Sequence, residues 1–380
     1  MGKCHEVVVV AFGNHKDAGE ICRAIGGNLL DVRIVPPPIP WKGSGKRMRQ
    51  VTALLSARTG YSALPRDQAM QREIDRLLEK MTFDLIQAEG FWVGCFDTTG
   101  SGAMKIIDAH NVEHDILARL ARTSRSGIRR LYYHFESIAC RREELAALGR
   151  QNAILVTSER DRMLIGKDLP QIPAFVIPNG VDTTYFTPKL ASEEPGSLVF
   201  TGAMNYAPNA DGILHFIDSV FPLICARVPG SVLYVVGGSP PPELKRRAGP
   251  HIVVTGHVED VRPYVWQASV YVVPLRSGGG TRLKILEALA MGKAIVTTSI
   301  GCEGLDVCEK ESVLLADEPV EFADAVVGLL RDIARRRMLG SNGLALAREK
   351  YDWTVVGESL EEAYRSLHRS KPSHQSTHVM

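Results

Sequence analysis

The segment Ser277-Gly278-Gly279-Gly280-Thr281-Arg282-Leu283-Lys284-Ile285-Leu286-Glu287 joins two contrasting patterns in the sequence. It follows an apolar run, 269–273, that predicts a strand, and it opens a helical pattern that continues to Met291. Three consecutive glycines let the backbone approach a ligand closely, because no Cβ is in the way. The free N–H groups at the start of the following helix form a site for an anion. This order of strand, glycine loop and helix predicts a phosphate-binding turn.

The charged residues of this segment point to the same kind of ligand. Arg282 and Lys284 place two cations in the first helical turn, where they oppose the helix dipole unless an anion is bound. Glu287 follows on a neighbouring part of the same face and can accept hydrogen bonds from hydroxyl groups. Together they predict a site for a sugar nucleotide, with the diphosphate at the helix start and the ribose at the acid. The simpler alternative is a solvated helix start with an ordinary Glu–Lys pair.

Short apolar runs alternate with longer helical stretches along the whole chain. The runs are apolar at nearly every position, which is typical of parallel strands that are buried on both faces. Two successive series of this kind predict an α/β fold with two doubly wound, Rossmann-like parallel sheets. The expected strands are residues 6–12, 32–35, 84–88, 105–108, 153–157, 174–177, 197–201, 231–236, 251–255, 269–273, 294–297 and 313–315.

Breaker-rich segments divide these two series. Turn residues at 177–182 and a polar stretch at 187–196 predict a boundary. We therefore expect a first domain at 1–178 and a second at 190–350. Whether the C-terminal helix, 353–368, packs back on the first domain is open from sequence alone. Residues 370–380 are expected to form a flexible tail.

Composition excludes several classes of protein. The 380 residues carry 45 Lys and Arg against 43 Asp and Glu, which argues against a general nucleic-acid binder. No apolar run approaches the roughly 20 residues that a membrane-spanning helix needs, and the N-terminus shows no signal peptide. Seven scattered cysteines without a CxxC pair suit a reducing cytosol and give no metal-site spacing. We expect a cytoplasmic protein with no metal and no nucleic-acid partner.

Two common nucleotide motifs are absent. The Walker A loop requires a glycine, four residues and then Gly-Lys-Ser/Thr, whereas Gly292-Lys293-Ala294 lacks both the hydroxyl and the upstream glycine. No GxGxxG follows the first strand either, which disfavours a nicotinamide-dependent dehydrogenase.

An ordered set of motifs resembles the retaining glycosyltransferase family 4, which has the two-domain GT-B fold. The resemblance extends over essentially the whole chain and is strongest to the branch found with bacterial exosortase and exopolysaccharide systems. It is carried by residues 108–113, 177–182, 201–209, 235–238, 254–258 and 280–292.

The resemblance implies a role for each matching residue. His110 would be catalytic and would face the donor sugar across the cleft between the domains, and Glu287 would bind the ribose. Gly202 and Asn205 would line the cleft. The donor diphosphate would be held by Gly279, Gly280, Thr281, Arg282 and Lys284.

Three features depart from the family pattern. Gly279 stands where the first acid of the family's E-x7-E signature is expected. The Arg/Lys pair that many relatives carry after the first strand of the second domain is absent from 202–211, so the phosphate load would fall on Arg282 and Lys284. The opening strand, 6–12, looks like the family's second strand, and the first domain is therefore expected to be shortened at its N-terminus.

These features imply an enzyme that transfers a sugar from a nucleotide-diphosphate donor to a glycan or lipid-linked acceptor. Exopolysaccharide or cell-envelope glycan biosynthesis is the expected setting, and no cofactor is expected beyond the donor. Two alternatives stay open. One is a GT-B enzyme resembling a sugar-nucleotide 2-epimerase, which has no acceptor. The other is a non-catalytic fold relative, suggested by the shortened start and by Gly279.

The sequence His110-Asn111-Val112-Glu113-His114 also matches the inverted-zincin pattern HxxEH. Zinc chemistry would need both histidines on one helical face with the glutamate between them. His110 follows a predicted strand end by two residues, and we therefore expect it in a loop. A structural, hydrogen-bonded histidine is the simpler alternative to its catalytic role.

A basic run follows this motif. Such a run is usually a solvated helix face. The alternative is attachment to an anionic membrane surface near a lipid-linked acceptor, which makes the membrane a peripheral partner. The run comprises Arg119, Arg122, Arg125, Arg129 and Arg130, followed by Arg141 and Arg142.

Overall fold

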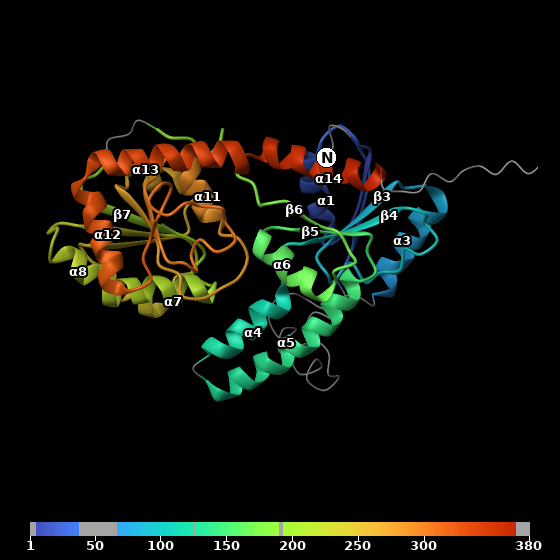
Figure 1. Cartoon of the computed structure of the whole chain (residues 1–380), viewed down its shortest axis with the longest axis horizontal. Coiled ribbons are helices and arrows are strands. Elements are labelled where there is room, and N and C mark those ends of the chain that lie inside the picture. The colour runs from blue at the N-terminus through green and yellow to red at the C-terminus, as the bar shows by residue number, and fades with distance from the viewer. Residues whose placement is uncertain (1–4, 38–66, 125, 190–192, 370–380) are drawn as a thin grey trace, which may run out of the picture. The chain divides into compact units, whose positions relative to one another are not determined.

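The computed structural model describes residues 5–37, 67–124, 126–189 and 193–369. The chain divides into two compact units, Met1–Val176 and Ile177–Met380, called here the N-terminal and C-terminal units (Figure 1). Each unit is an α/β structure built on parallel strands.

The N-terminal unit contains two parallel sheets. One pairs β1 with β2, and α1 connects these two strands. The other has the strand order β3-β4-β5-β6, with α3 before β3 and α6 between β5 and β6. Side chains of β4 and β5 such as Ile107 and Ile154 are fully buried. The elements are β1 (Val7–Phe12), α1 (His15–Ile25), β2 (Leu29–Val35), α3 (Gln68–Lys80), β3 (Leu85–Glu89), β4 (Met104–Ala109), β5 (Ala153–Val156), α6 (Glu159–Asp168) and β6 (Ala174–Val176).

A helical hairpin is inserted between β4 and β5. It consists of α4 (Glu113–Thr123) and α5 (Gly127–Leu148), and it projects from the sheet of the N-terminal unit (Figure 1). Ser126 begins α5 as its N-cap and accepts a hydrogen bond from the Arg129 amide.

The C-terminal unit has one six-stranded parallel sheet with the order β12-β11-β10-β7-β8-β9. The chain therefore starts in the middle of the sheet, builds to one side, and then returns to build on the other side of β7. In such sheets ligands bind beyond the carboxyl ends of the strands, at the point where the order reverses. Here that point lies between β7 and β10. The strands are β7 (Ser197–Thr201), β8 (Val232–Val236), β9 (Ile252–Gly256), β10 (Val270–Val273), β11 (Ile295–Thr297) and β12 (Leu314–Leu315).

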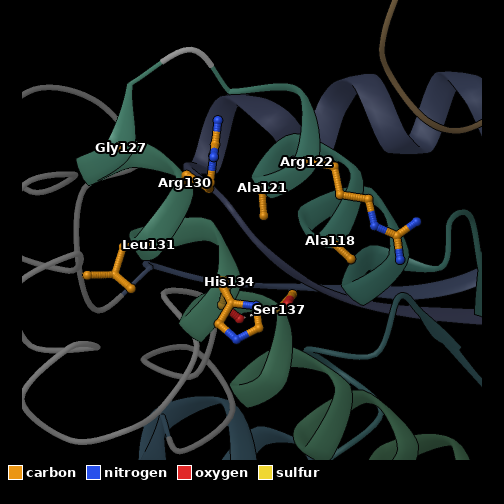
Figure 2. A pocket seen from close by; sticks show the side chains of 8 residues that line it. All are labelled: Ala118, Ala121, Arg122, Gly127, Arg130, Leu131, His134 and Ser137. Atoms are coloured by element: carbon orange, nitrogen blue, oxygen red, sulfur yellow. Dashed lines mark hydrogen bonds between the residues drawn. The ribbon is translucent and has the colours of Figure 1, made fainter.

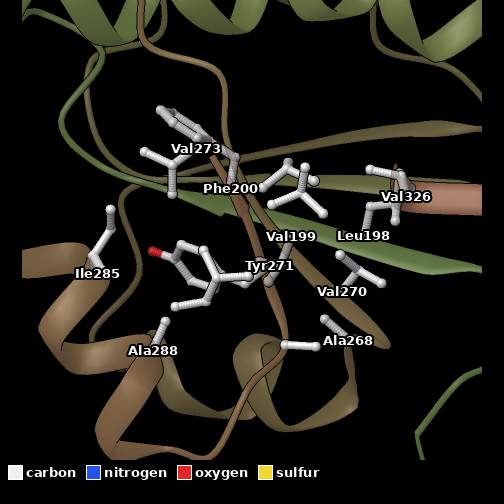
Figure 3. Packing of buried hydrophobic residues seen from close by; sticks show 14 of the residues in the cluster. Leu198, Val199, Phe200, Ala268, Val270, Tyr271, Val273, Ile285, Ala288 and Val326 are labelled. Carbon is white, nitrogen blue, oxygen red and sulfur yellow. The ribbon is translucent and has the colours of Figure 1, made fainter. Parts of the chain in front are cut away.

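Helices cover this sheet and exclude water from a large core. Phe200, Tyr271 and Ile285 belong to that core, which Figure 3 shows between β7, β10 and α11. The helices are α7 (Ala207–His215), η1 (Phe216–Val220), α8 (Phe221–Cys225), α9 (Pro242–Lys245), α10 (Arg262–Gln267), α11 (Leu283–Ala290), α12 (Pro319–Arg331), α13 (Ile333–Leu346), η2 (Ala347–Tyr351) and α14 (Trp353–Arg369).

The α/β prediction is confirmed. Every one of the expected strand runs contains a strand, and the largest shift at either end is at β2, which begins at Leu29 and not at residue 32. After β7, the helices α7, η1 and α8 follow in direct succession, with a π-helical turn in the middle. The predicted tail, 370–380, lies outside the described residues. Among the helices of the described residues, we find none that combines the length and the apolarity needed to cross a membrane.

Candidate functional site

The glycine loop, defined here as residues 277–282, lies beside the reversal point of the C-terminal sheet. It follows β10 and leads into α11, while the neighbouring strand β7 leads through residues 202–206 into α7. A Cβ added at Gly278 would lie 3.2 Å from the Tyr206 hydroxyl, so the two loops are in close proximity. This is the position in the sheet where a doubly wound fold binds its ligand.

Lys284 extends from the first turn of α11 toward the loop after β7. Its Nζ donates a hydrogen bond to Asn209 Oδ1 over 2.8 Å and lies 4.1 Å from the centroid of the Phe200 ring. Burial and the nearby Arg282 together lower the pKa of Lys284 to about 7, against the opposing effect of Glu287. No carboxylate among the described residues forms a salt bridge with this ammonium group.

Two glycines make room for this lysine. Gly202 has φ +150°, and a Cβ there would lie 2.6 Å from Lys284 Nζ and 2.8 Å from Asn209 Nδ2. Gly237, after β8, has φ +146°, and its Cβ would lie 1.9 Å from the Gly202 carbonyl oxygen. A side chain at either position would displace the loop after β7. Gly202, predicted to line the site, is therefore in contact with Lys284.

Arg282 has a different environment from Lys284. It precedes α11 at the N-cap position, is 6% exposed, and donates from Nη1 to the carbonyl of Gly280 over 2.7 Å and to that of Gly279. Gly278 and Gly280 have φ values of +121° and +71°, which a residue with a side chain rarely adopts. Arg282 therefore holds the glycine loop in its folded form through the loop's own carbonyl groups.

A second contact fixes the far end of the loop. The Asn179 side chain donates a hydrogen bond to Thr281 Oγ1. Asn179 belongs to the motif 177–182, which we had used only for the domain boundary and the resemblance. The contact joins residues that are far apart in the sequence, and no local pattern predicts it.

Glu287 lies one turn after Lys284 on α11 and is partly buried. Burial raises the pKa of its carboxyl group, and the positive charge of Lys284 partly offsets that effect. Asn205 is exposed on the loop after β7, whereas Asn209, which we did not select, is buried and bonded to Lys284. Asn209 stands at the end of the motif 201–209, and that motif was the only sequence signal for it.

His110 belongs to the N-terminal unit and forms a cluster with two acids. It lies in the loop after β4, with Nε2 3.2 Å from Glu89 Oε2 and Nδ1 3.5 Å from Asp108 Oδ1. The hydrogen bond to Glu89 raises the pKa of His110, and Asp108 adds to the effect against the opposing influence of burial. Burial raises the pKa of Asp108 to about 6. Burial also acts to raise the pKa of Glu89, but the hydrogen bond from His110 outweighs it, and the pKa of Glu89 is lowered. The cluster favours an imidazolium held between two carboxylates.

The same three residues could hold a divalent cation, because each offers a ligand atom within 4.8 Å of the others. The HxxEH alternative does not form such a site. His110 lies before α4, which begins at Glu113, and pairs with Glu89, whereas His114 Nδ1 lies 2.6 Å from Glu144 Oε2. The two histidines thus bind different acids, and the expectation that His110 lies in a loop is confirmed.

Comparison with known proteins identifies the C-terminal unit. Residues 195–332 match the family model described as glycosyl transferases group 1. This part of the chain is therefore similar to the group 1 glycosyltransferases. It contains the glycine loop, Lys284, Glu287 and both glycines at the reversal point, and the predicted enzyme class, a glycosyltransferase, is thereby confirmed for this part of the chain.

Three relatives extend the comparison. An uncharacterized 44.6 kDa protein in the cps region of Klebsiella pneumoniae is 22% identical over 302 residues, covering 76% of this chain and 75% of that protein. A phosphatidyl-myo-inositol mannosyltransferase of Mycolicibacterium smegmatis is 27% identical over 206 residues, covering 51% of this chain and 52% of that enzyme. The structure of Anabaena Alr3699/HepE in complex with UDP has a TM-score of 0.66 at 13% identity, covering 94% of this chain and 99% of that one.

The structural likeness confirms the predicted GT-B fold. The chain spans about half the length of the mycobacterial mannosyltransferase it matches. Donor, acceptor and stereochemical course are therefore matters for the proposal that follows.

Proposed function

We propose that this chain transfers a sugar from a nucleoside-diphosphate donor to a glycan or lipid-linked acceptor in exopolysaccharide or other cell-envelope glycan synthesis. Retention of the anomeric configuration and a place in the exosortase-associated branch of family 4 are parts of the same proposal. The cps-region relative supports the glycan setting, and the mannosyltransferase relatives, named for phosphatidyl-myo-inositol, support a lipid-linked acceptor. The UDP bound by HepE supports a nucleotide donor.

The observation that carries the proposal is the position of Lys284. Its ammonium group is partly buried at the reversal point, and its partners, Asn209 and the Phe200 ring, are uncharged. A diphosphate in this place would supply the missing negative charge, which stabilises the ammonium form. The loop after β7 lacks the Arg/Lys pair that many relatives carry there. Lys284, which extends from α11 to this loop, places a cation at the same position.

The chemistry follows from the charge of the leaving group. As the bond to the sugar breaks, negative charge accumulates on the departing diphosphate, and cations fixed in a water-poor site stabilise it. Lys284, the amides of residues 279–281 and the N-terminus of α11 would supply this stabilisation. In this proposal Arg282 exchanges a loop carbonyl for a phosphate oxygen, and Glu287 accepts from the ribose hydroxyls. The imidazolium of His110 remains the proposed catalytic group, and no metal ion is required.

The test begins with a thermal-shift panel of UDP-, GDP- and ADP-sugars, followed by titration calorimetry with the nucleoside diphosphate that stabilises the chain most. Lys284→Met should weaken its binding by about 1.5–3 kcal/mol, the scale of a lost charge-assisted hydrogen bond. Arg337→Met, which removes an exposed cation of α13 from the same unit, is the matched control and should leave affinity unchanged. Equal affinity for the wild type and Lys284→Met would refute the donor site.

Turnover separates the proposal from its two alternatives. Sugar transfer should require an acceptor, and His110→Gln should abolish it while leaving nucleotide affinity intact. Release of an isomerised sugar nucleotide without any acceptor would favour the epimerase-like alternative. Nucleotide-sugar binding without turnover, whatever acceptor is supplied, would favour a non-catalytic relative.

A further inference from the structure

The α4–α5 hairpin has a reversed distribution of polar and apolar side chains. On α5 the buried positions include Glu136, Ser137 and Glu144, whereas four apolar side chains among its first twelve residues face solvent. These four, Ile128, Leu131, Phe135 and Ile138, are 85%, 58%, 55% and 57% exposed. Their spacing of three and four residues places them in one line along the helix, called here the apolar stripe. Soluble proteins rarely expose a continuous row of this kind unless it contacts something.

Arginines dominate the charge around the stripe, because Glu136, the acid that lies between Phe135 and Ile138, is buried. Residues 116–135 contain five arginines and neither Asp nor Glu. Arg119 pairs with Asp115 at the base of α4, but within the described residues Arg122, Arg129 and Arg130 form no salt bridge with a carboxylate. The stripe is therefore flanked by cations that are available to an external anion.

A hollow of about 600 Å³ adjoins the stripe between the two helices. Arg122 of α4 and Arg130 of α5 lie on opposite sides of it in Figure 2, with the small Ala121 between them and His134 below. Leu131 belongs to both the hollow and the stripe. Basic groups over a floor of small side chains provide room for a phosphate group, directly beside a surface suited to acyl chains.

We propose that the outer face of the α4–α5 hairpin docks on an anionic lipid surface, with the apolar stripe entering the acyl boundary and lipid phosphates contacting Arg122 and Arg130. An interfacial helix combines a row of apolar residues with Lys or Arg at its sides, and α5 has both. A second copy of this chain fits poorly, because it would bring the same arginines to the contact. An uncharged bilayer fits poorly as well, because it would offer no negative charge to the arginines.

The experiment is co-sedimentation of the full chain with phosphatidylcholine vesicles, with and without 30% phosphatidylglycerol. The wild type should bind the anionic vesicles at least tenfold more tightly than the neutral ones, and higher salt should weaken this binding. Ile128→Ser/Leu131→Ser/Phe135→Ser should reduce binding at least tenfold, and Arg122→Gln/Arg130→Gln should remove the preference for anionic vesicles. Free glycerol phosphate should not release the protein, which distinguishes a lipid surface from a soluble phosphate ligand.

The matched control is Val320→Ser/Ile333→Ser/Met338→Ser, which removes three exposed apolar side chains from α12 and α13 and should leave vesicle binding unchanged. Thermal stability and nucleotide affinity of each variant show that the chain is folded. The proposal would be overturned if the wild type bound vesicles with and without phosphatidylglycerol equally well. It would also be overturned if the stripe variant bound anionic vesicles as tightly as the wild type. An oligomer that depends on the stripe and does not bind vesicles would overturn it as well. Because vesicle and nucleotide binding are measured separately, failure of this proposal is distinguishable from failure of the donor site.

Discussion

The helices α5 and α11 differ in which of their side chains are buried and which are exposed. In α11 the buried positions are Ile285, Leu286, Ala288, Leu289 and Ala290, and the polar Lys284 and Glu287 lie at the edge of that core. In α5 the buried positions include Glu136 and Glu144 as well as Cys140, Ala147 and Leu148, while four large apolar side chains nearer its start are exposed. In α11 the apolar side chains are buried, and Lys284 extends from the helix toward the loop after β7. In α5 four apolar side chains are exposed and form a surface.

The difference shows two ways in which a helix provides a binding surface. The core of the C-terminal unit fixes α11, and a single charged side chain at its start then has a defined direction. The hairpin combines apolar packing of Leu117 and Leu148 with a polar anchor, because Glu144 accepts from the amides of Glu113 and His114 over 2.9 and 3.1 Å at the start of α4. The four residues of the apolar stripe are exposed and lie outside this core, so they remain available to a partner.

The largest effect is expected at the polar anchor of the hairpin. Glu144 is 1% exposed, and Glu144→Ala would leave the first amides of α4 and the His114 ring without their acceptor. The free energy of unfolding should fall by about 2–4 kcal/mol, the cost of losing hydrogen bonds to a buried charge. Urea denaturation checks this, with the exposed Glu358→Ala on α14 as the control, which should change stability by less than about 0.5 kcal/mol. Equal stability of both variants would show that the anchor is unimportant.

A second prediction concerns pH and the charged side chain of α11. With a pKa of about 7, Lys284 is largely neutral at pH 8, whereas a bound diphosphate favours its protonated form. Nucleoside-diphosphate binding at pH 8 should therefore take up as much as one proton, and affinity should fall by up to about tenfold per pH unit above 7, or about 1.4 kcal/mol. Calorimetry in buffers of different ionisation enthalpy measures this uptake. Its persistence in Lys284→Met would assign the proton to another group.

A smaller effect is expected one turn further along α11. Glu287→Ala should weaken binding of a nucleoside diphosphate by about 1 kcal/mol, through loss of hydrogen bonds to the ribose. Binding of inorganic pyrophosphate, which has no ribose, should weaken much less. Competition titrations with both ligands give the comparison, and equal losses would remove the ribose assignment.

The smallest effect is expected on the stripe. Leu131→Ser replaces a leucine that is 58% exposed, and the free energy of unfolding should change by less than about 0.5 kcal/mol, in contrast to a core leucine. The fully buried Leu148→Ser, on the same helix, provides that contrast and should cost several kcal/mol. A large loss of stability in Leu131→Ser would mean that the stripe is part of the fold and not a free surface.

The sequence predicted the strands well and the contacts at the edges of the sheets poorly. In the N-terminal unit, the described strands form two separate sheets where a single sheet was expected. Continuous apolar runs located every strand of the C-terminal sheet, because strands buried on both faces leave a strong pattern. The glycine loop and Lys284 were also apparent, since three glycines before a helix are a local signal. The bond from Lys284 to Asn209 joins the first turns of α11 and α7, and only the folded sheet brings these two helices together.

The hairpin shows a different reason for failure. Its arginines suggested either a solvated face or a membrane contact, and the apolar stripe between them was not recognised. Residues with the spacing of Ile128, Leu131 and Phe135 normally face a core, and only the structure shows that they face outward.

The carboxylate of Glu144 also affects the order in which the hairpin can form. Most helices carry their own cap at the first turn, but α4 begins at Val112 without a side-chain cap and borrows its acceptor from a residue 31 positions downstream of Glu113. Its first turn therefore gains its stabilisation only when the lower half of α5 has docked, so that the two helices are expected to fold and to open together as one cooperative segment.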